Sequence, residues 1–403
     1  MKLTVDERWD LIDKIAEQVV KYGEYRYRLK DAIADITVKP LTGIPIAIAV
    51  LYGFWSFFGA FAGFFTDGFL VKLFDNHWLP WLQEVFPGKG GWLYYIFVGD
   101  PAADNCFEAF GVLTSALFVA IGVVLPAIVA FYLFLIILED TGYLPRLAVL
   151  VDTVLHKIGL HGFAVIPMIL SLGCNVPAVI ATRALETGKQ RFMMAVLLAI
   201  FIPCGAQLGI MFEVIPGYVG FVMLYLLAGF FVFGFILDRL LPGKSPEILL
   251  DVPPYQRPIA KNVTRKLWMR VKSFFKVAIP FVLLGVIIVN LMYLTGFLGW
   301  LANLLEPLLC GWFGVPKETV GPLVAAFLRK DLAVAQLSAI EMTMPQLVTS
   351  VVLVSLYFPC VATFAMLIRE GREGGLKGVS QYLFGGLGVL IAVIFLWGGL
   401  IRL

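Results

Sequence analysis

The sequence predicts an all-α polytopic membrane protein built from two inverted repeats with re-entrant or discontinuous helices. The 403 residues are 60% hydrophobic and only 15% charged, whereas soluble domains carry about 25% charged residues. Several runs nearly free of charge reach the length of a membrane span, about 20 residues. Segments in the two halves of the chain also match at a nearly constant offset. A soluble protein with one large core is the alternative, but its helices would rarely be apolar on all sides over a bilayer thickness.

Residues 1–39 predict an amphipathic helical segment outside the bilayer. They hold 16 charged residues of nearly balanced sign, and apolar residues recur at helical spacing at Trp9, Ile12, Ala16 and Val19. A signal peptide would be apolar and basic instead. The first transmembrane helix is expected at 40–66. An extracytoplasmic interfacial segment follows at 67–110, where several Trp and Tyr suit the membrane interface.

Seven apolar runs predict the membrane spans, at 41–66, 112–138, 190–212, 218–241, 274–295, 346–368 and 379–401. The loop 242–272 holds seven Lys or Arg against two acids, so the positive-inside rule predicts that it is cytoplasmic. Four crossings precede this loop, which places the N-terminus on the same side. The loop separates a first repeat at 111–241 from a second repeat at 273–403.

The repeat is visible in matched segments. "TGYLPRLAVLVD" at 141–152 matches "TGFLGWLANLLE" at 295–306, and "IPCGA" at 202–206 matches "FPCVA" at 358–362. Each copy contains three full spans by this reading, and an odd number inverts the second copy in the membrane. The charges agree, because the loop after the first hairpin is basic and its counterpart at 337–345 is not. Inverted repeats with broken helices place a transported solute where the halves meet, so a transporter is the leading class.

The segments 163–183 and 318–338 are apolar, interrupted, and flanked by Gly and Pro. Irregular backbone at membrane depth is tolerated only where it is buried in protein or lines a cavity. Cys174 and Asn175 lie at the first break, and a helix is expected to begin near Pro177. Asp331 lies at the matching depth of the second repeat. At the first break the alternative to a re-entrant hairpin or discontinuous helix is a kinked packing helix. Asp331 is either a cation ligand or the counter-ion of a neighbouring Lys or Arg.

Cys204 and Cys360 each follow a proline inside an apolar run, and each proline frees a backbone carbonyl one turn earlier. With Cys174 they bring three sulfurs to elements that the repeat joins. Thiolate ligands suit Fe(II), Zn(II) or Cu(I) better than Mg or Ca, so a metal path is predicted. Simple packing of apolar cysteines is the alternative. The five cysteines of the chain give no disulfide framework.

Glu139 and Asp140 close a long apolar run at the side inferred to be cytoplasmic. They are either an exit station for a cation or ordinary acids at the start of the following helix. On the other side, "GDPAADNCFEAF" at 99–110 is read as a capped loop or as an attractor of cations before entry. No nucleotide site is predicted, because "PGKS" at 242–245 lacks the preceding glycine of a phosphate-binding loop.

Five motifs in order carry a family resemblance: "LEDTGYLPRLAVLVDTVLHKIGLHG", "LGCNVPAVIATR", "IPCGAQL", "FLRKDLAVAQL" and "FPCVATFAMLIRE". Together they resemble the membrane region of the FeoB ferrous-iron transporters over essentially the whole chain. The resemblance implies two Gate-type repeats that carry Fe(II) across the cytoplasmic (inner) membrane of a bacterium or archaeon. It implies path residues at Cys174, Asn175, Cys204 and Cys360, and an acidic role at Asp331. Gln207 departs from the family, which often has Arg there.

The resemblance further implies a GTP-binding domain, which precedes the membrane region in most family members. Either a separate GTPase subunit or a chain trimmed to the membrane part explains its absence, and the start at Met1 favours the separate subunit. Expected partners are this GTPase, a small FeoA-like accessory protein and the lipid bilayer. A homo-oligomer is compatible with the sequence, and nothing indicates nucleic-acid binding. No permanent cofactor is expected, since Fe(II) is the substrate.

Three other functions compete with this interpretation. A Gate-type carrier of another divalent metal or of a nucleoside-like solute is the nearest, although a nucleoside site would want more hydrogen-bonding side chains and an aromatic platform. An intramembrane enzyme would need a nucleophile with a base in reach, and the three histidines lie outside the predicted spans. A non-transporting assembly subunit is the third.

Overall fold

The fold is known from a computed structural model of residues 1–403. It describes residues 14–15, 19, 29–86, 91, 94, 97–99, 106, 111–118, 121–122, 125–243, 254–272, 295–296, 300, 303–304, 306–328, 330–338, 340–357, 359–373 and 385–399. The regular elements of these residues are all helical, with no strand among them. This confirms the all-α class predicted from the sequence.

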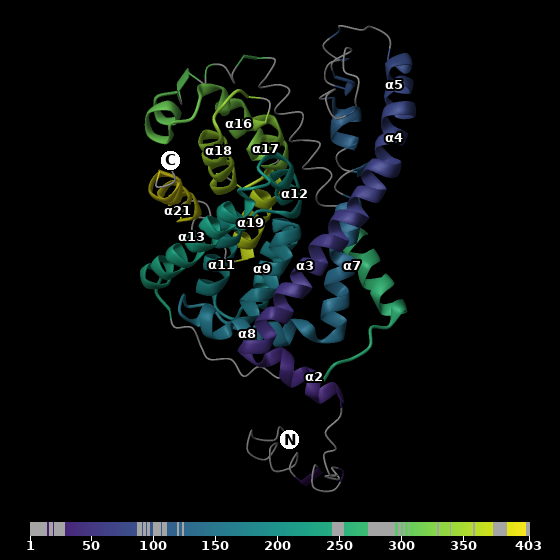
Figure 1. The fold of residues 1–403 in the computed structure, drawn as a ribbon, viewed down its shortest axis with the longest axis vertical. Helices are drawn as coiled ribbons and strands as arrows, with labels where there is room; N and C mark the ends of the chain where they lie inside the picture. The colour runs from purple at the N-terminus through teal and green to yellow at the C-terminus, as the bar shows by residue number, and fades with distance from the viewer. Residues whose placement is uncertain are drawn as a thin grey trace, which may run out of the picture.

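A single long helical run occupies the N-terminal part of the described chain. After α2 (Leu29–Val38), Lys39 is extended and Pro40 opens α3 (Pro40–Phe65), where the missing amide hydrogen of proline costs nothing. The run continues beyond the end expected at residue 66, and in Figure 1 it rises along one side of the molecule. Its further parts are η1 (Thr66–Leu70), α4 (Val71–Leu73), η2 (Phe74–Trp78) and α5 (Leu79–Val85).

A sharp bend joins the next two helices. After η3 (Val112–Ala116), α7 (Leu125–Thr141) runs toward the α2 end of the molecule, and α8 (Tyr143–His156) leaves it at 85°. Gly142 stands at the bend with φ of 81°, a conformation that costs other residues about 1–2 kcal/mol. The sequence "TGYLP" therefore fixes the turn that lays α8 across the end of the bundle.

Two sets of four helices form the repeat. The first set is α9 (Val165–Gly173), α10 (Asn175–Ala181), α11 (Gly188–Phe201) and α12 (Gly205–Val214). The second set is α16 (Val320–Leu328), α17 (Lys330–Leu337), α18 (Met344–Leu356) and α19 (Val361–Glu373). Each set begins with a hairpin of two short helices and continues with two helices separated by a Pro-Cys step. The discontinuous helices expected from the sequence are present in both sets.

Local features repeat with the helices. Gly142 and Gly296 have φ of 81° and 69°, and Gly159 and Gly314 have φ of 73° and 71°. Each pair consists of positions that the internal match aligns. Thr187 and Thr343 likewise both precede a helix as its N-cap residue, before α11 and α18. The two sets are thus built from the same turns and caps.

The two hairpins approach the core from opposite ends. In Figure 1, α8 lies at the end where α2 is found and α9 lies above it in the middle of the molecule, while α16 and α17 lie toward the far end. The sets interlock, because α10 of the first packs on α19 of the second, and α17 packs on α12. One apolar core runs through both sets and includes α13 (Val219–Leu240). The arrangement agrees with inverted repeats.

Four helical stretches of the described residues are long and apolar enough to cross a membrane, or five if the bent pair α7–α8 is one span. These four stretches are Pro40–Val85, Gly188–Val214, Val219–Leu240 and Met344–Arg372. The span expected at 274–295 lies almost wholly outside the described residues. The remaining short elements are η5 (Gly162–Ala164), η6 (Thr182–Ala184), η7 (Pro307–Phe313), η8 (Lys317–Thr319), α21 (Gly386–Ala392) and η10 (Val393–Gly398).

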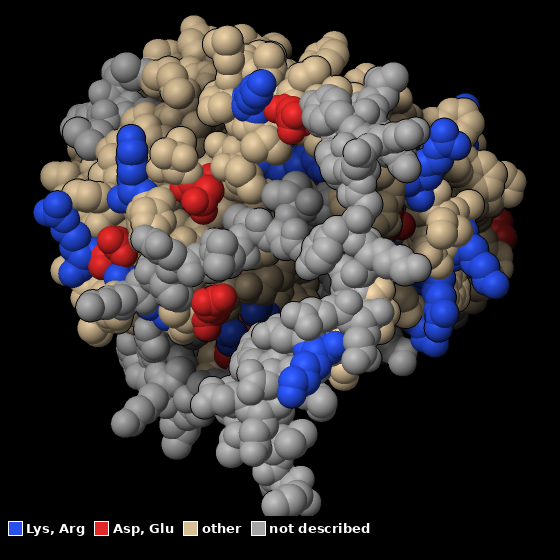
Figure 2. Space-filling view, turned by 90° about the horizontal axis from the view of Figure 1, so that it is seen from below, with Lys and Arg blue, Asp and Glu red and all other residues tan. Residues whose placement is uncertain are grey.

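Charged side chains mark the α2 end of the molecule. Figure 2 looks onto this end and shows Lys, Arg, Asp and Glu side chains spread over it. The helix at residues 260–272, which closes the basic loop of the sequence, is tied to this end where Lys266 and Arg270 meet α7. Tyr255, just before it, donates a hydrogen bond from its hydroxyl to Thr37 Oγ1 of α2 at 3.1 Å. Residues 254–272 and α2 therefore lie at the same end of the molecule, which agrees with the four crossings counted between them.

Candidate functional site

The first helix break is centred on Cys174. This residue is extended, with φ of −154° and ψ of 131°, so it ends α9 and precedes α10. Helix α10 begins at Asn175, two residues before the start expected at Pro177. Gly173 is required here for space, since a Cβ atom would lie 2.2 Å from the ring of Phe131. The break is therefore set by the sequence "GCNVP" rather than by a kinked packing helix.

Asn175 ties this break to the first Pro-Cys step. Its Oδ1 accepts a hydrogen bond from the Ser171 hydroxyl at 2.5 Å, and its Nδ2 donates to the Ile202 carbonyl at 3.4 Å. Ile202 directly precedes Pro203 and Cys204, where α11 gives way to α12. A buried amide with partners on both elements holds the hairpin against the second break.

The two Pro-Cys steps leave helix carbonyls without their usual partners. Pro203 and Pro359 have no amide hydrogen, so they free the carbonyls of Ala199 and Ser355, four residues earlier in α11 and α18. Both carbonyls accept hydrogen bonds from the same group, the ammonium of Lys330, at 3.3 and 2.7 Å. Lys330 begins α17 and is only 5% exposed. The second hairpin break thus contacts the Pro-Cys steps of both repeats.

The structure brings the three predicted cysteines to one region. Cys174 lies within electrostatic range of Cys360 and Cys204, and Lys330 lies within range of Cys360 and Cys204. All three cysteines are partly buried and form no disulfide. Cys360 Sγ also lies 3.1 Å from Thr363 Oγ1. Among the described residues, however, no three His, Cys, Asp or Glu side chains are close enough together to hold one metal ion.

Asp331 follows Lys330 on α17, but its side chain lies outside what the structure describes. Gln207, where the sequence departs from the resembled family, is fully buried and donates from Nε2 to the Ser355 hydroxyl at 2.8 Å. Sequence reasoning missed Lys330 as a site residue. The internal match between the repeats could have identified it. Helices α9 and α16 start 155 positions apart, and the same offset aligns Asn175 with Lys330.

An apolar seal separates the cysteines from the α2 end. It consists of a small buried cluster between α10, α11 and α19, namely Val176, Val179, Ala195, Ala199, Met366 and Leu367. Beyond it, Arg183 donates hydrogen bonds from Nε and Nη2 to the carboxylate of Glu370 at 2.7–3.0 Å. This ion pair joins the first repeat to the second. The seal and the pair together hold α10 of the first repeat against α19 of the second.

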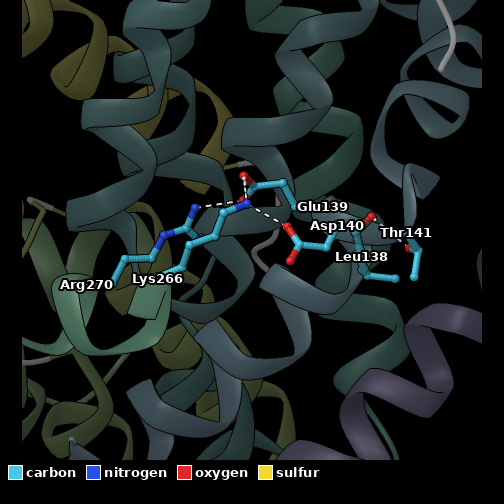
Figure 3. Close-up of polar contacts among 6 residues, drawn as sticks. All are labelled: Leu138, Glu139, Asp140, Thr141, Lys266 and Arg270. Carbon is cyan, nitrogen blue, oxygen red and sulfur yellow. Dashed lines mark hydrogen bonds and ion pairs between the residues drawn. The ribbon is translucent and has the colours of Figure 1, made fainter. Parts of the chain in front are cut away.

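Glu139 and Asp140 lie at the end of α7 and are paired with the helix at 260–272. Lys266 Nζ contacts Glu139 at 3.1 Å and Asp140 at 2.6 Å, and Arg270 Nη2 contacts Glu139 at 2.8 Å (Figure 3). The hydrogen bond to Asp140 contributes most to raising the pKa of Lys266 above its usual value. The following helix is preceded by Gly142 as its cap residue, so neither acid caps it.

Tyr132 connects these acids to the cysteines. Its ring lies under the guanidinium of Arg270, 5.4 Å from ring centroid to carbon, and it is within electrostatic range of Cys174. A polar cavity lies beside the acids and is lined also by Gln256, Arg257 and Asn262. A chain of neighbouring side chains therefore leads from Cys174 toward the α2 end. The acids predicted on the other side at 99–110 lie outside the described residues.

The fold and this site define a polytopic α-helical membrane protein made of two repeats whose broken helices meet in its interior. Comparison with known families agrees. A family model described as "Nucleoside recognition", the Gate model, matches residues 121–218 and again 275–373, and the model for the C terminus of ferrous iron transport protein B matches 219–270. The chain belongs to the FeoB family and corresponds to its membrane region.

Curated relatives extend the match over most of the chain. The Fe(2+) transporter FeoB of Staphylococcus aureus strain COL is 28% identical over 89% of this chain, and that of Methanocaldococcus jannaschii is 26% identical over 91%. This chain spans 58% of the length of each. A Porphyromonas gingivalis protein named as a fusion of Fe(2+) transport protein A and FeoB is 31% identical over 41% of the chain. No solved structure gives a significant match.

Proposed function

We propose that this protein transports ferrous iron across the cytoplasmic membrane of a bacterium or archaeon, as the membrane subunit of a FeoB-like system. The observation that carries the proposal is the convergence of three cysteines from both repeats at the broken helices. Sulfur ligands favour Fe(II) over hard ions such as Mg, and the relatives are named as Fe(2+) transporters. A nucleoside-like solute is not favoured, because the site offers sulfur and few hydrogen-bonding side chains.

The proposed ligands are Cys174, Asn175, Cys204, Cys360 and Asp331. Among the described residues no three His, Cys, Asp or Glu side chains are placed to hold one ion, so in this proposal ion binding draws the two repeats closer. That movement is the kind of repeat-against-repeat motion by which inverted-repeat carriers alternate. Asn175 would exchange its present hydrogen-bond partners for the ion.

Glu139 and Asp140 would act after the ion leaves the cysteines. In the state described, both acids hold Lys266 or Arg270. For these acids to accept a cation, the helix at 260–272 must withdraw its basic side chains. That helix is therefore a suitable place for a partner to control the exit.

A GTPase is the proposed partner, either as a separate subunit or as a domain of a longer chain. The N-terminus is cytoplasmic in this proposal, and the docking surface consists of α2 and residues 254–272. Thr37 and Tyr255 already join these two elements by a hydrogen bond, so force on α2 reaches Lys266 and Arg270. GTP hydrolysis would occur in the partner, and this subunit would catalyse no reaction. The fusion relative supports a FeoA-like accessory protein as a second partner.

Iron uptake into proteoliposomes tests the proposal. The double variant Cys204→Ser/Cys360→Ser is expected to lower the rate of Fe(II) uptake at least tenfold, because the hydroxyl is a poorer ligand for this ion. Cys310→Ser is the matched control, since Cys310 is exposed and lies outside the site. Unchanged Fe(II) uptake in the double variant would remove the cysteines from the path.

A further inference from the structure

Lys330 occupies a position built for a cation. Helix carbonyls released by a break are the groups that coordinate small cations in carriers with broken helices. Here the carbonyls of Ala199 and Ser355 come from different repeats, and both were freed by a proline. A single buried ammonium bridges them at 3.3 and 2.7 Å. The position is therefore an oxygen-lined cation site that the protein fills with its own side chain.

Further oxygen atoms surround this position. The Ser355 hydroxyl is held by Gln207 Nε2 at 2.8 Å, and it donates to the Val351 carbonyl at 2.7 Å. Gln207 Oε1, on the same amide group, is buried and accepts no hydrogen bond from the described residues. A buried acceptor without a donor costs about 1–3 kcal/mol, so its presence here points to a ligand that the site receives in another state.

Lys330 also lies where it would oppose the cargo. It is within electrostatic range of Cys204 and Cys360, and like charges repel strongly at low dielectric. A divalent ion at these cysteines and an ammonium at the two carbonyls cannot share the region at low cost. Either the ammonium leaves the two carbonyls when the ion arrives, or the ion does not bind at the cysteines.

We propose that the Lys330 ammonium is a tethered stand-in for the transported cation, bridging the two repeats in the ion-free state and yielding the Ala199 and Ser355 carbonyls to the arriving ion. The proposal rests on the proposed function in taking a divalent cation as the cargo. It adds an oxygen subsite next to the sulfurs, made of these two carbonyls and Gln207 Oε1. Lys330 moves as a charged group, and no proton is transferred.

Co(II) binding to the purified full chain tests this. Lys330→Met keeps a long unbranched side chain without charge, and it is expected to lower the dissociation constant for Co(II) at least tenfold. The melting temperature of the ion-free protein should fall, because the bridge between the repeats is lost. A lysine with only a structural role would lower both stability and affinity, so the opposite signs are diagnostic. Unchanged or weaker Co(II) binding by Lys330→Met overturns the proposal.

Two further variants complete the test. Lys330→Gln retains an amide donor for the carbonyls. Because the charge is gone, it should also bind Co(II) more tightly than the unaltered protein. Weaker or equal Co(II) binding by Lys330→Gln overturns the proposal even if Lys330→Met fails to fold. Lys189→Met is the control, because Lys189 also donates to two backbone carbonyls, at 2.8 and 3.2 Å. It should leave Co(II) binding unchanged.

The absorption of Co(II)–thiolate charge transfer separates this inference from the cysteine role. Tighter binding by Lys330→Met without that absorption would support the oxygen subsite and contradict sulfur ligation. Thiolate absorption with equal affinity in all Lys330 variants would support the proposed function and overturn the stand-in role. Absence of Co(II) binding in every form would overturn both.

Discussion

The ion pair between Arg183 and Glu370 offers the sharpest test of how the cysteine site is closed. It lies beyond the apolar seal, at the far end of the contact between α10 and α19. The Arg183 side chain is 42% exposed and that of Glu370 is 7% exposed. Exposed pairs contribute about 0–1 kcal/mol, and breaking a buried pair costs about 3–5 kcal/mol. Because water screens the arginine, we take about 1 kcal/mol for this pair.

We call the open state the one in which α10 and α19 are separated. Losing the ion pair, about 1 kcal/mol, should raise the population of this state about fivefold. The assay is the rate at which a membrane-impermeant maleimide modifies Cys174 in inside-out vesicles, with the other four cysteines replaced by Ser. Glu370→Gln and Arg183→Gln are each expected to raise this rate about fivefold, and the double variant should not raise it further. Cys174 is partly exposed in the structure, so the assay compares its modification rate between variants, and this rate should rise when α10 and α19 separate more often.

A matched control breaks an ion pair within one repeat. Asp238→Asn removes the contact of Asp238 with Lys189, 2.8 Å from nitrogen to oxygen, which joins α11 to the end of α13. Modification of Cys174 should then proceed at the original rate. Two results would show that the pair does not close the site. One is an equal rate of Cys174 modification in Glu370→Gln and in the unaltered protein. The other is a rate in the double variant that equals the combined effects of the two single variants.

Two other substitutions test the repeat and the first break. Gly159→Ala should lower the melting temperature more than Gly296→Ala. Both residues have positive φ, a strain of about 1–2 kcal/mol for alanine. At Gly159 a Cβ atom would also lie 1.9 Å from Asp238 Oδ1, whereas at Gly296 it would meet none of the described residues within 4 Å. Equal losses would contradict the close approach. Asn175→Leu should destabilise the protein by about 1–3 kcal/mol, because it removes the hydrogen-bond partner of the buried Ser171 hydroxyl and of the partly buried Ile202 carbonyl. Asn262 is exposed, so the free energy of unfolding of Asn262→Leu, measured by the same denaturation assay as for Asn175→Leu, should stay within about 0.5 kcal/mol of the unaltered protein. A similar loss in both variants would show that Asn175 does not hold the first break against the Pro-Cys step.

The internal match shows how far local sequence reaches. A proline removes an amide hydrogen wherever it stands, so the freed carbonyls before Cys204 and Cys360 could be predicted without a structure. Glycines at matched turns likewise indicated the repeat, and the structure gives them positive φ. The predicted end of the first helix at residue 66 agrees with the end of α3 at Phe65, but helical structure continues through η1, α4, η2 and α5 to Val85. Composition marks where lipid contact ends, but it does not mark where a helix stops.

The sequence by itself determined that this protein is helical, membrane-spanning and duplicated, and it placed Cys174, Cys204 and Cys360 at breaks in the helices. Those properties follow from hydrophobic runs and from backbone groups that each residue carries with it. Only the tertiary structure decided which groups meet: Lys330 at the carbonyls of both repeats, and Glu370 at Arg183. Such partners come from segments far apart in the chain, and packing selects among many side chains that could satisfy the same charge or carbonyl.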